Sequence, residues 1–259
     1  MAKGSPPENT AAVIWRNVRK VYPNGHEALS GVSLEVSPGE VLALLGTSGS
    51  GKTTLLKTVN RLIDPSAGEV VVQGRPTAEW NPIALRRSIG YVIQDVGLMP
   101  HLTVSANVGI VPKLQGVKKI ERDARASELL SLVGLEPGRF ARLMPRELSG
   151  GQRQRVGVAR ALAADPPLVL MDEPFGALDP VTRRELQDEF RVWQKRLGMA
   201  VIVVTHDTRE ALRIADRLAL LDHGRLVQCG TPADFTERPA NAFVRSFFEE
   251  AGPVVKEPS

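Results

Sequence analysis

The stretch VLALLGTSGSGKTT, residues 41–54, decides how the rest of the chain is interpreted. Its first five residues are apolar, which predicts a buried strand, and the residues that follow Lys52 have a helical pattern. A glycine-rich turn between a strand and a helix can point several backbone N–H groups inward, because glycine has no Cβ to block them. Together with the positive end of the helix, these donors form a cradle for phosphate. The stretch therefore predicts a P-loop.

The polar residues of this stretch have expected roles in holding a nucleoside triphosphate. Lys52 supplies a positive charge to the β- and γ-phosphate oxygens, and the hydroxyl of Thr53 is a ligand for Mg²⁺. The residues that we expect around the phosphates are Gly46, Thr47, Ser48, Gly49, Ser50, Gly51, Lys52, Thr53 and Thr54.

Short apolar runs and helical patterns alternate along the chain, which favours an α/β fold with a mainly parallel sheet. Strands are predicted at 13–21, 41–45, 69–73, 89–93, 168–172, 200–205 and 218–221. Helices are predicted at 52–62, 124–133, 150–163, 180–197 and 208–215.

Residues 95–164 contain no convincing strand and are predicted to form a helical subdomain inserted into the ATP-binding core, residues 11–94 and 165–248. An antiparallel β portion is expected at the N-terminal side of that core. Residues 1–10 are predicted to be a disordered leader, and residues 249–259 a tail.

Composition excludes several classes of protein. The 259 residues carry a net charge of +4 from scattered rather than massed basic residues, so a nucleic-acid-binding surface is not indicated. No apolar run approaches the roughly 20 residues of a membrane-spanning helix. The single cysteine, Cys229, excludes an internal disulfide framework and fits a reducing compartment.

A second motif follows the strand predicted at 168–172. Asp172 and Glu173 are adjacent carboxylates at the end of an apolar strand, the edge of an α/β sheet where ligands bind. Asp172 is expected to hold Mg²⁺ or its water, and Glu173 to orient and deprotonate an attacking water. Taken alone, Glu173 could also be an ordinary polar strand end.

A third motif is Leu148-Ser149-Gly150-Gly151-Gln152, directly before an amphipathic helical pattern. Ser149 is a candidate N-cap, and the glycines allow a close approach of the backbone to a phosphate. By itself the motif could be no more than the start of a helix.

With these three motifs in this order, the sequence resembles the ATP-binding cassette subunits of ABC transporters over residues 14–248. The resemblance implies that Ser149, Gly150, Gly151 and Gln152 belong to the signature motif, which contacts ATP bound to a second subunit. It implies that Tyr22 stacks on adenine and that Gln94 ligates Mg²⁺ and senses the γ-phosphate. His206 would contact the γ-phosphate, and Asp179 would end a loop, residues 176–179, that crosses the dimer interface.

The resemblance also implies partners and a location. Two such subunits, identical or paired, would bind two ATP molecules head to tail at the cytoplasmic face of a membrane, as peripheral subunits. They would drive integral membrane permease subunits and act indirectly with a solute-binding protein. The family docks its permeases near the loop after Gln94, where Val96, Leu98 and Met99 are unusually apolar. These three side chains could instead pack inside the helical region.

The segment 90–104 most resembles the importers of quaternary-ammonium osmoprotectants such as glycine betaine, choline and carnitine, and Asn107 fits this resemblance. Many of those subunits carry C-terminal CBS modules, whereas this chain stops soon after Phe248, so we expect no appended sensor. Two alternatives stay open: an importer of another solute, such as an amino acid or a polyamine, and an ABC-type ATPase that acts on nucleic acid. A nucleotide-binding scaffold without turnover conflicts with the presence of both Glu173 and His206.

Overall fold

A six-stranded sheet forms the centre of this computed structural model, which describes residues 11–94, 96–176 and 178–249. Its strand order is β10-β9-β3-β8-β7-β6, and all its pairings are parallel except that of β9 with β10. The strands are β3 (Val41–Leu45), β6 (Ile89–Val92), β7 (Leu168–Asp172), β8 (Ala200–Val204), β9 (Arg217–Asp222) and β10 (Arg225–Gly230). Every residue of β3, β7 and β8 is buried, as the apolar runs predict for a parallel sheet covered on both faces.

A smaller antiparallel sheet has the strand order β2-β1-β4-β5. Its strands are β1 (Val13–Val21), β2 (Glu27–Val36), β4 (Ala67–Val72) and β5 (Arg75–Pro76). The expected α/β fold with an N-terminal antiparallel portion is therefore confirmed. Strands β2, β5 and β10 were absent from the sequence predictions. In β2, Ser30 and Gly31 interrupt the apolar pattern, and the strand forms because β1 pairs with it along its length.

The six-stranded sheet separates two apolar clusters. Val41, Ala43 and Leu45 of β3 face the cluster that includes helices α5 (Lys119–Leu132), α7 (Gly150–Leu162) and α8 (Pro180–Leu197). Leu42 and Leu44 face the other cluster, with α1 (Lys52–Val59) and the antiparallel sheet. Alternate residues of one strand thus anchor helices on one side and the smaller sheet on the other.

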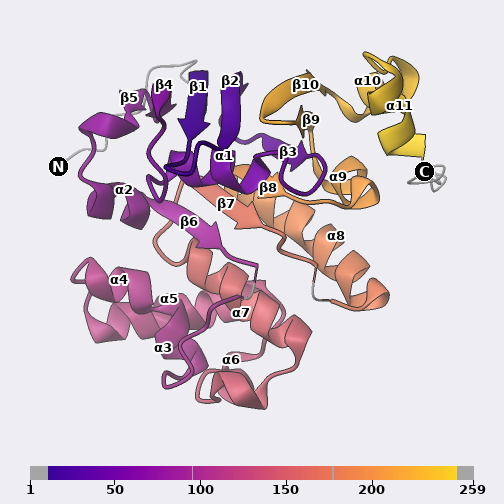
Figure 1. Cartoon of the computed structure of the whole chain (residues 1–259). Helices are drawn as coiled ribbons and strands as arrows, with labels where there is room; N and C mark the ends of the chain where they lie inside the picture. The colour runs from indigo at the N-terminus through magenta and orange to yellow at the C-terminus, as the bar shows by residue number, and fades with distance from the viewer. Residues whose placement is uncertain (1–10, 95, 177, 250–259) are drawn as a thin grey trace.

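Short helices dominate the segment between β6 and β7. It contains α3 (Val104–Val108), α4 (Ile110–Leu114), α6 (Pro137–Phe140) and the 3₁₀ turn Pro145–Glu147 in addition to α5 and α7, and Figure 1 shows these helices gathered below the strands. No strand occurs among the described residues between 96 and 164, as the sequence predicts. The domain boundaries themselves remain a prediction, and the leader, residues 1–10, and residues 250–259 of the tail lie outside the described residues.

The predicted bounds are correct for one helix and wrong for another. Helix α8 has the predicted bounds, because Asp179 caps its first turn and Gly198 ends it in a left-handed conformation. Helix α1 ends at Val59 instead of residue 62, and Arg61 then adopts a positive φ of 53°. The remaining helices are α2 (Pro82–Ser88), α9 (Thr208–Ile214), α10 (Pro232–Glu237), α11 (Ala242–Glu249) and the 3₁₀ turn Thr77–Glu79. Within the described residues, none of the helices is both long and apolar enough to span a membrane.

Candidate functional site

The P-loop joins β3 to α1 and is tightly surrounded. A Cβ atom on Gly46 would lie 2.2 Å from the carbonyl oxygen of Leu221, and one on Gly51 would lie 2.5 Å from the carbonyl oxygen of Ala28. Both glycines also have positive φ angles, 147° and 101°. Larger residues at these two positions would force the loop away from the strands that hold it.

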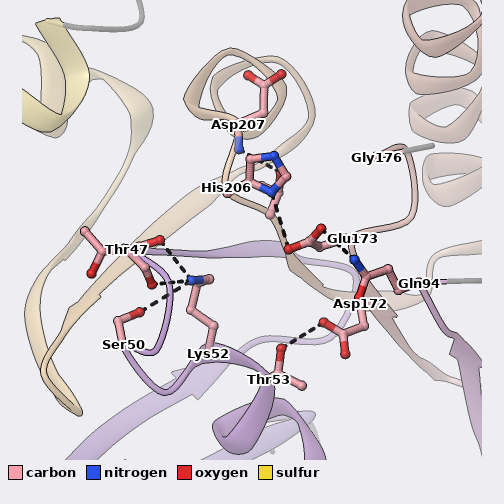
Figure 2. Close-up of polar contacts among 12 residues, drawn as sticks. Thr47, Ser50, Lys52, Thr53, Gln94, Asp172, Glu173, Gly176, His206 and Asp207 are labelled. Atoms are coloured by element: carbon pink, nitrogen blue, oxygen red, sulfur yellow. Dashed lines mark hydrogen bonds and ion pairs between the residues drawn. The ribbon is translucent and has the colours of Figure 1, made fainter. Parts of the chain in front are cut away.

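Lys52 lies inside the turn that precedes it. Its Nζ donates hydrogen bonds to the carbonyl oxygens of Gly46, at 2.9 Å, and Thr47, at 2.8 Å, and lies 3.5 Å from the Oγ of Ser50, as Figure 2 shows. Burial lowers the pKa of Lys52, and the nearby Glu173 and Asp172 carboxylates oppose that shift. The ammonium group is therefore already held over the loop, close to where a phosphate would need a counter-charge.

Asp172 is the last residue of β7 and is only 8% exposed. Its Oδ1 accepts a hydrogen bond of 3.0 Å from the hydroxyl of Thr53, in the first turn of α1 (Figure 2). Burial raises the pKa of Asp172, and this hydrogen bond acts in the opposite direction. Two of the three predicted Mg²⁺ ligands, Thr53 and Asp172, are thus adjacent.

These residues fit a magnesium nucleotide. A hydroxyl and a carboxylate are hard oxygen ligands of the kind that Mg²⁺ prefers. Within the described residues no cluster of three or more His, Cys, Asp or Glu side chains could hold a metal by itself. A bound Mg²⁺ would therefore complete its shell with phosphate oxygens and water, which is usual for this ion. A Cβ on Gly49 would meet no atom within 4 Å, so this side of the loop is open.

Glu173 brings three separate segments together. Its Oε1 lies 3.3 Å from Nδ1 of His206, after β8, and its Oε2 accepts a hydrogen bond of 3.2 Å from Nε2 of Gln94, after β6. Figure 2 shows the Glu173 side chain between those of His206 and Gln94. Glu173 has a positive φ of 48°, a strained conformation for a residue with a side chain. Such strain persists where surrounding contacts fix it, and it is commonest at functional sites.

Tyr22 lies beside the start of α1. Its hydroxyl is 3.4 Å from the Oγ1 of Thr54, and its half-buried ring is parallel to the ring of His26 with centroids 6.3 Å apart. Nζ of Lys20 lies 5.4 Å from the centre of the tyrosine ring. The structure thus brings Tyr22 next to the P-loop helix, and its stacking role remains a prediction.

The predicted signature residues lie at the start of α7. Ser149 Oγ accepts a hydrogen bond from the backbone N–H of Gln152, and the side chain of Gln152 accepts one from the backbone N–H of Ser149. This reciprocal pair is a capping box. Ser149 and Gly150 are exposed, and a Cβ on Gly151 would lie 2.9 Å from Cγ2 of Thr182 in α8. No hydrogen bond among the described residues joins this segment to the P-loop.

Asp179 caps α8: its Oδ1 accepts hydrogen bonds from the backbone N–H groups of Val181 and Thr182. Hydrogen bonding from Thr182 lowers the pKa of Asp179, whose side chain is exposed. The loop at 176–179 includes Ala177, which lies outside the described residues.

Of the apolar side chains after Gln94, Leu98 packs against the core cluster, whereas Met99 is 40% exposed. Asn107 is buried, and its side-chain amide exchanges two hydrogen bonds with the backbone of Met99, which fixes this loop against α3.

Three polar residues next to the site, Arg183, Asp207 and Glu210, were not predicted from the sequence. Arg183 in α8 donates to the carbonyl oxygens of Gly176 and Leu178 and pairs with Asp207, the residue after His206. Glu210 is 4% exposed, and burial raises its pKa to about 7. The spacing of Asp207 and Glu210 signals a helix N-terminus, but only the fold shows that both lie next to the site.

Comparisons with known proteins identify the family of this chain. A family model described as "ABC transporter" matches residues 29–176. The choline transport ATP-binding protein OpuBA of Bacillus subtilis (strain 168) is 51% identical over 231 residues, which are 89% of this chain and 60% of OpuBA. The glycine betaine uptake system ATP-binding protein YehX of Escherichia coli (strain K12) is 49% identical over 234 residues, 90% of this chain and 75% of YehX.

A solved dimeric structure of the ATP-binding cassette MJ0796, in a post-hydrolysis state with ADP and Pi, superposes with a TM-score of 0.75 at 37% identity. The match covers 85% of this chain and 98% of that structure. The chain spans about 60% of the length of curated relatives such as OpuBA. On the family model, the sequence identity and the shared fold together, the chain belongs to the ABC transporter family.

Proposed function

We propose that this chain binds and hydrolyses ATP, with Mg²⁺, as the ATP-binding subunit of an ABC importer for quaternary-ammonium osmoprotectants. The observation that carries the enzymatic part is the convergence of Lys52, Asp172, Glu173, Gln94 and His206 beside one P-loop. A scaffold that only binds nucleotide has no need for a strained glutamate flanked by a glutamine and a histidine.

In the proposed reaction, water attacks the γ-phosphorus of ATP, and the bond to the β,γ-bridging oxygen breaks to give ADP and phosphate. Glu173 accepts a proton from the attacking water, and Gln94 and His206 hold the carboxylate in position. Lys52 balances charge on the β- and γ-phosphate oxygens. A Mg²⁺ ion held by Thr53, Asp172 and Gln94 would supply further neutralisation of those oxygens.

The proposal includes a head-to-tail dimer. Ser149 and Gly150 are exposed, and the hydrogen bonds that Ser149 and Gln152 make within the chain are those of a helix cap. In the dimer this segment would face the γ-phosphate of ATP bound to the P-loop of the second subunit, with Asp179 near the interface. ATP would then bridge the two chains, and hydrolysis would release them. Such a cycle can drive permease subunits between two states.

The solute is proposed from the relatives. Choline and glycine betaine are named for OpuBA and YehX, both about half identical to this chain. By analogy the chain would act with integral permease subunits, and indirectly with a solute-binding protein, at the cytoplasmic face of the membrane.

Uptake of radiolabelled solutes by a strain lacking this gene tests the proposal. We expect loss of uptake of glycine betaine, choline or a related trimethylammonium compound. A plasmid copy of the wild-type gene should restore uptake, and a copy with Glu173→Gln should not. Unchanged uptake of every quaternary amine, with loss of an amino acid or polyamine, would contradict the solute and leave the ATPase proposal standing. Restoration by the Glu173→Gln copy would contradict the ATPase proposal.

A further inference from the structure

The loop after Gln94 has an unusual backbone. Val96 has a φ of 58°, and a β-branched residue seldom adopts such an angle. Gly97 has a φ of 56°, and a Cβ there would lie 2.4 Å from Cδ1 of Ile93. Strain of this kind persists only where contacts from the rest of the protein hold it.

Arg160, in the last turn of α7, supplies such contacts. Its Nη1 donates a hydrogen bond of 2.7 Å to the carbonyl oxygen of Gly97, and its Nη2 donates one to the carbonyl oxygen of Val96. Burial lowers the pKa of Arg160. Two adjacent carbonyl groups thus bind two separate nitrogen atoms of one planar guanidinium, a fixed fork that the single nitrogen of lysine does not present.

Gly157 supplies the second contact from the same helix. A Cβ at this position would lie 2.5 Å from Cγ1 of Val96. Glycine inside a helix is unfavourable compared with alanine, so the sequence keeps this position open at a cost in helix stability. Gly157 and Arg160 are three residues apart and therefore lie on one face of α7. This face holds both the side chain and the carbonyl group of Val96.

Helix α7 connects two parts of the proposed site. Ser149 caps its first turn, and Arg160 in its last turn binds the carbonyl oxygens of Val96 and Gly97. Two residues before Val96 in the chain, Gln94 donates to Glu173. Because a helix moves largely as a rigid rod, displacement of its first turn is transmitted to the loop over about 15–20 Å.

We infer that Arg160 is a positioning residue for hydrolysis: with Gly157, it fixes the strained turn at Val96 and thereby makes the position of Gln94 depend on the position of α7. The inference rests on the proposed ATPase function. It assigns to Arg160 no contact with ATP, so nucleotide affinity is independent of it.

The first test is Arg160→Lys, which keeps the positive charge and replaces the fixed fork of two nitrogen donors by a single nitrogen. Turnover number should fall by up to about 100-fold, the loss that a displacement of about 1 Å can cause. The dissociation constant of a non-hydrolysable ATP analogue with Mg²⁺ should stay the same. The matched control is Arg155→Lys in the same helix, because Arg155 donates to the carbonyl oxygen of Val133 and pairs with Glu189. This control should keep its turnover number even if its melting temperature falls.

The second test uses a compensating pair and does not depend on Arg160. Gly157→Ala strengthens the helix but pushes a methyl group into Val96, so turnover should fall while the melting temperature is kept. Val96→Ala removes the atom that this methyl group meets. The double variant should therefore recover most of the turnover lost by Gly157→Ala, a non-additive result expected only for groups in contact.

The outcomes separate this inference from the function on which it rests. If wild type hydrolyses ATP and Glu173→Gln does not, but Arg160→Lys and Gly157→Ala turn over normally, the positioning role is wrong and the ATPase function stands. Equal losses of turnover and analogue binding in Arg160→Lys would also overturn the inference, since they indicate general damage to the fold. If wild type itself hydrolyses no ATP with or without its membrane partners, the proposed function fails first.

Discussion

The two glycine-rich segments of this chain, residues 46–51 and 149–152, have similar compositions but different surroundings. In the first, the loop carbonyls bind Lys52, and the adjoining strands leave no space for side chains on Gly46 and Gly51. In the second, the polar groups of Ser149 and Gln152 bind each other at an exposed helix end. The first segment is complete within one chain, while the second presents a free surface. The difference fits a site whose chemistry lies in one subunit and whose closure needs another.

The largest expected effect comes from a change to Glu173, in the part of the site that lies within one chain. Glu173→Gln keeps the shape of the side chain and removes its ability to accept a proton, so turnover should fall on the order of 10²- to 10⁴-fold. ATP affinity should be retained, and the variant should form an ATP-dependent dimer on a sizing column. Measured turnover close to that of wild type would show that Glu173 is not the general base.

Variants of the two segments, combined, test whether the P-loop of one chain and Ser149 of a second chain form one site. Lys52→Ala should weaken ATP binding to its own chain, because it removes the counter-charge. Ser149→Arg should leave ATP binding to one chain intact and block closure on the partner's nucleotide. Each variant alone should be nearly inactive.

In an equal mixture that pairs at random, half of the dimers combine the two variants, and each of these has one site with an intact P-loop and an intact Ser149. Activity should then rise to at most about a quarter of the wild-type value. A mixture no more active than its components, under conditions where wild type turns over, would contradict the head-to-tail site.

The difference between the segments also shows what could be predicted from sequence. Strands 41–45 and 168–172 were predicted correctly, since uninterrupted apolar residues specify a buried parallel strand locally. Strand β2 was missed, because its stability comes from β1 rather than from its own pattern. The motifs and the family resemblance identified Glu173, Gln94 and His206, and the fold shows that they meet. No sequence signal distinguished Arg160 or Glu210 from the exposed charges of other amphipathic helices. Only their burial in the folded chain distinguishes Arg160 and Glu210 from such exposed charges.

A third prediction concerns the buried carboxyl group of Glu210. Burial raises the pKa of Glu210 from 4.5 to about 7 in the folded protein. Between these values the folded state binds more protons than the unfolded state, so the free energy of unfolding must fall as pH rises. At about 1.4 kcal/mol per pKa unit the decline is at most about 3 kcal/mol, and it is complete once the pH is about one unit above this folded-state pKa. Urea unfolding from about pH 5 to about pH 8 should show this decline in wild type and lose it in Glu210→Gln. The same pH dependence in both proteins would assign it to another group.

The smallest effect is expected at Tyr22, because its proposed contact is with adenine and not with the reacting phosphates. Stacking of a base on an aromatic ring contributes about 1–3 kcal/mol in comparable contacts, so Tyr22→Ala should weaken ATP binding by that amount and leave the turnover number at saturation unchanged. Tyr22→Phe is the control, because it keeps the ring and loses only the contact of the hydroxyl with Thr54. Its affinity should stay close to that of wild type.

Stacking recognises the face of a base and not its hydrogen-bonding edges, so wild type should also hydrolyse GTP, though less efficiently. Strict rejection of GTP would show that another residue reads the edge of adenine, and equal affinity losses in both Tyr22 variants would assign the role to the hydroxyl instead of the ring.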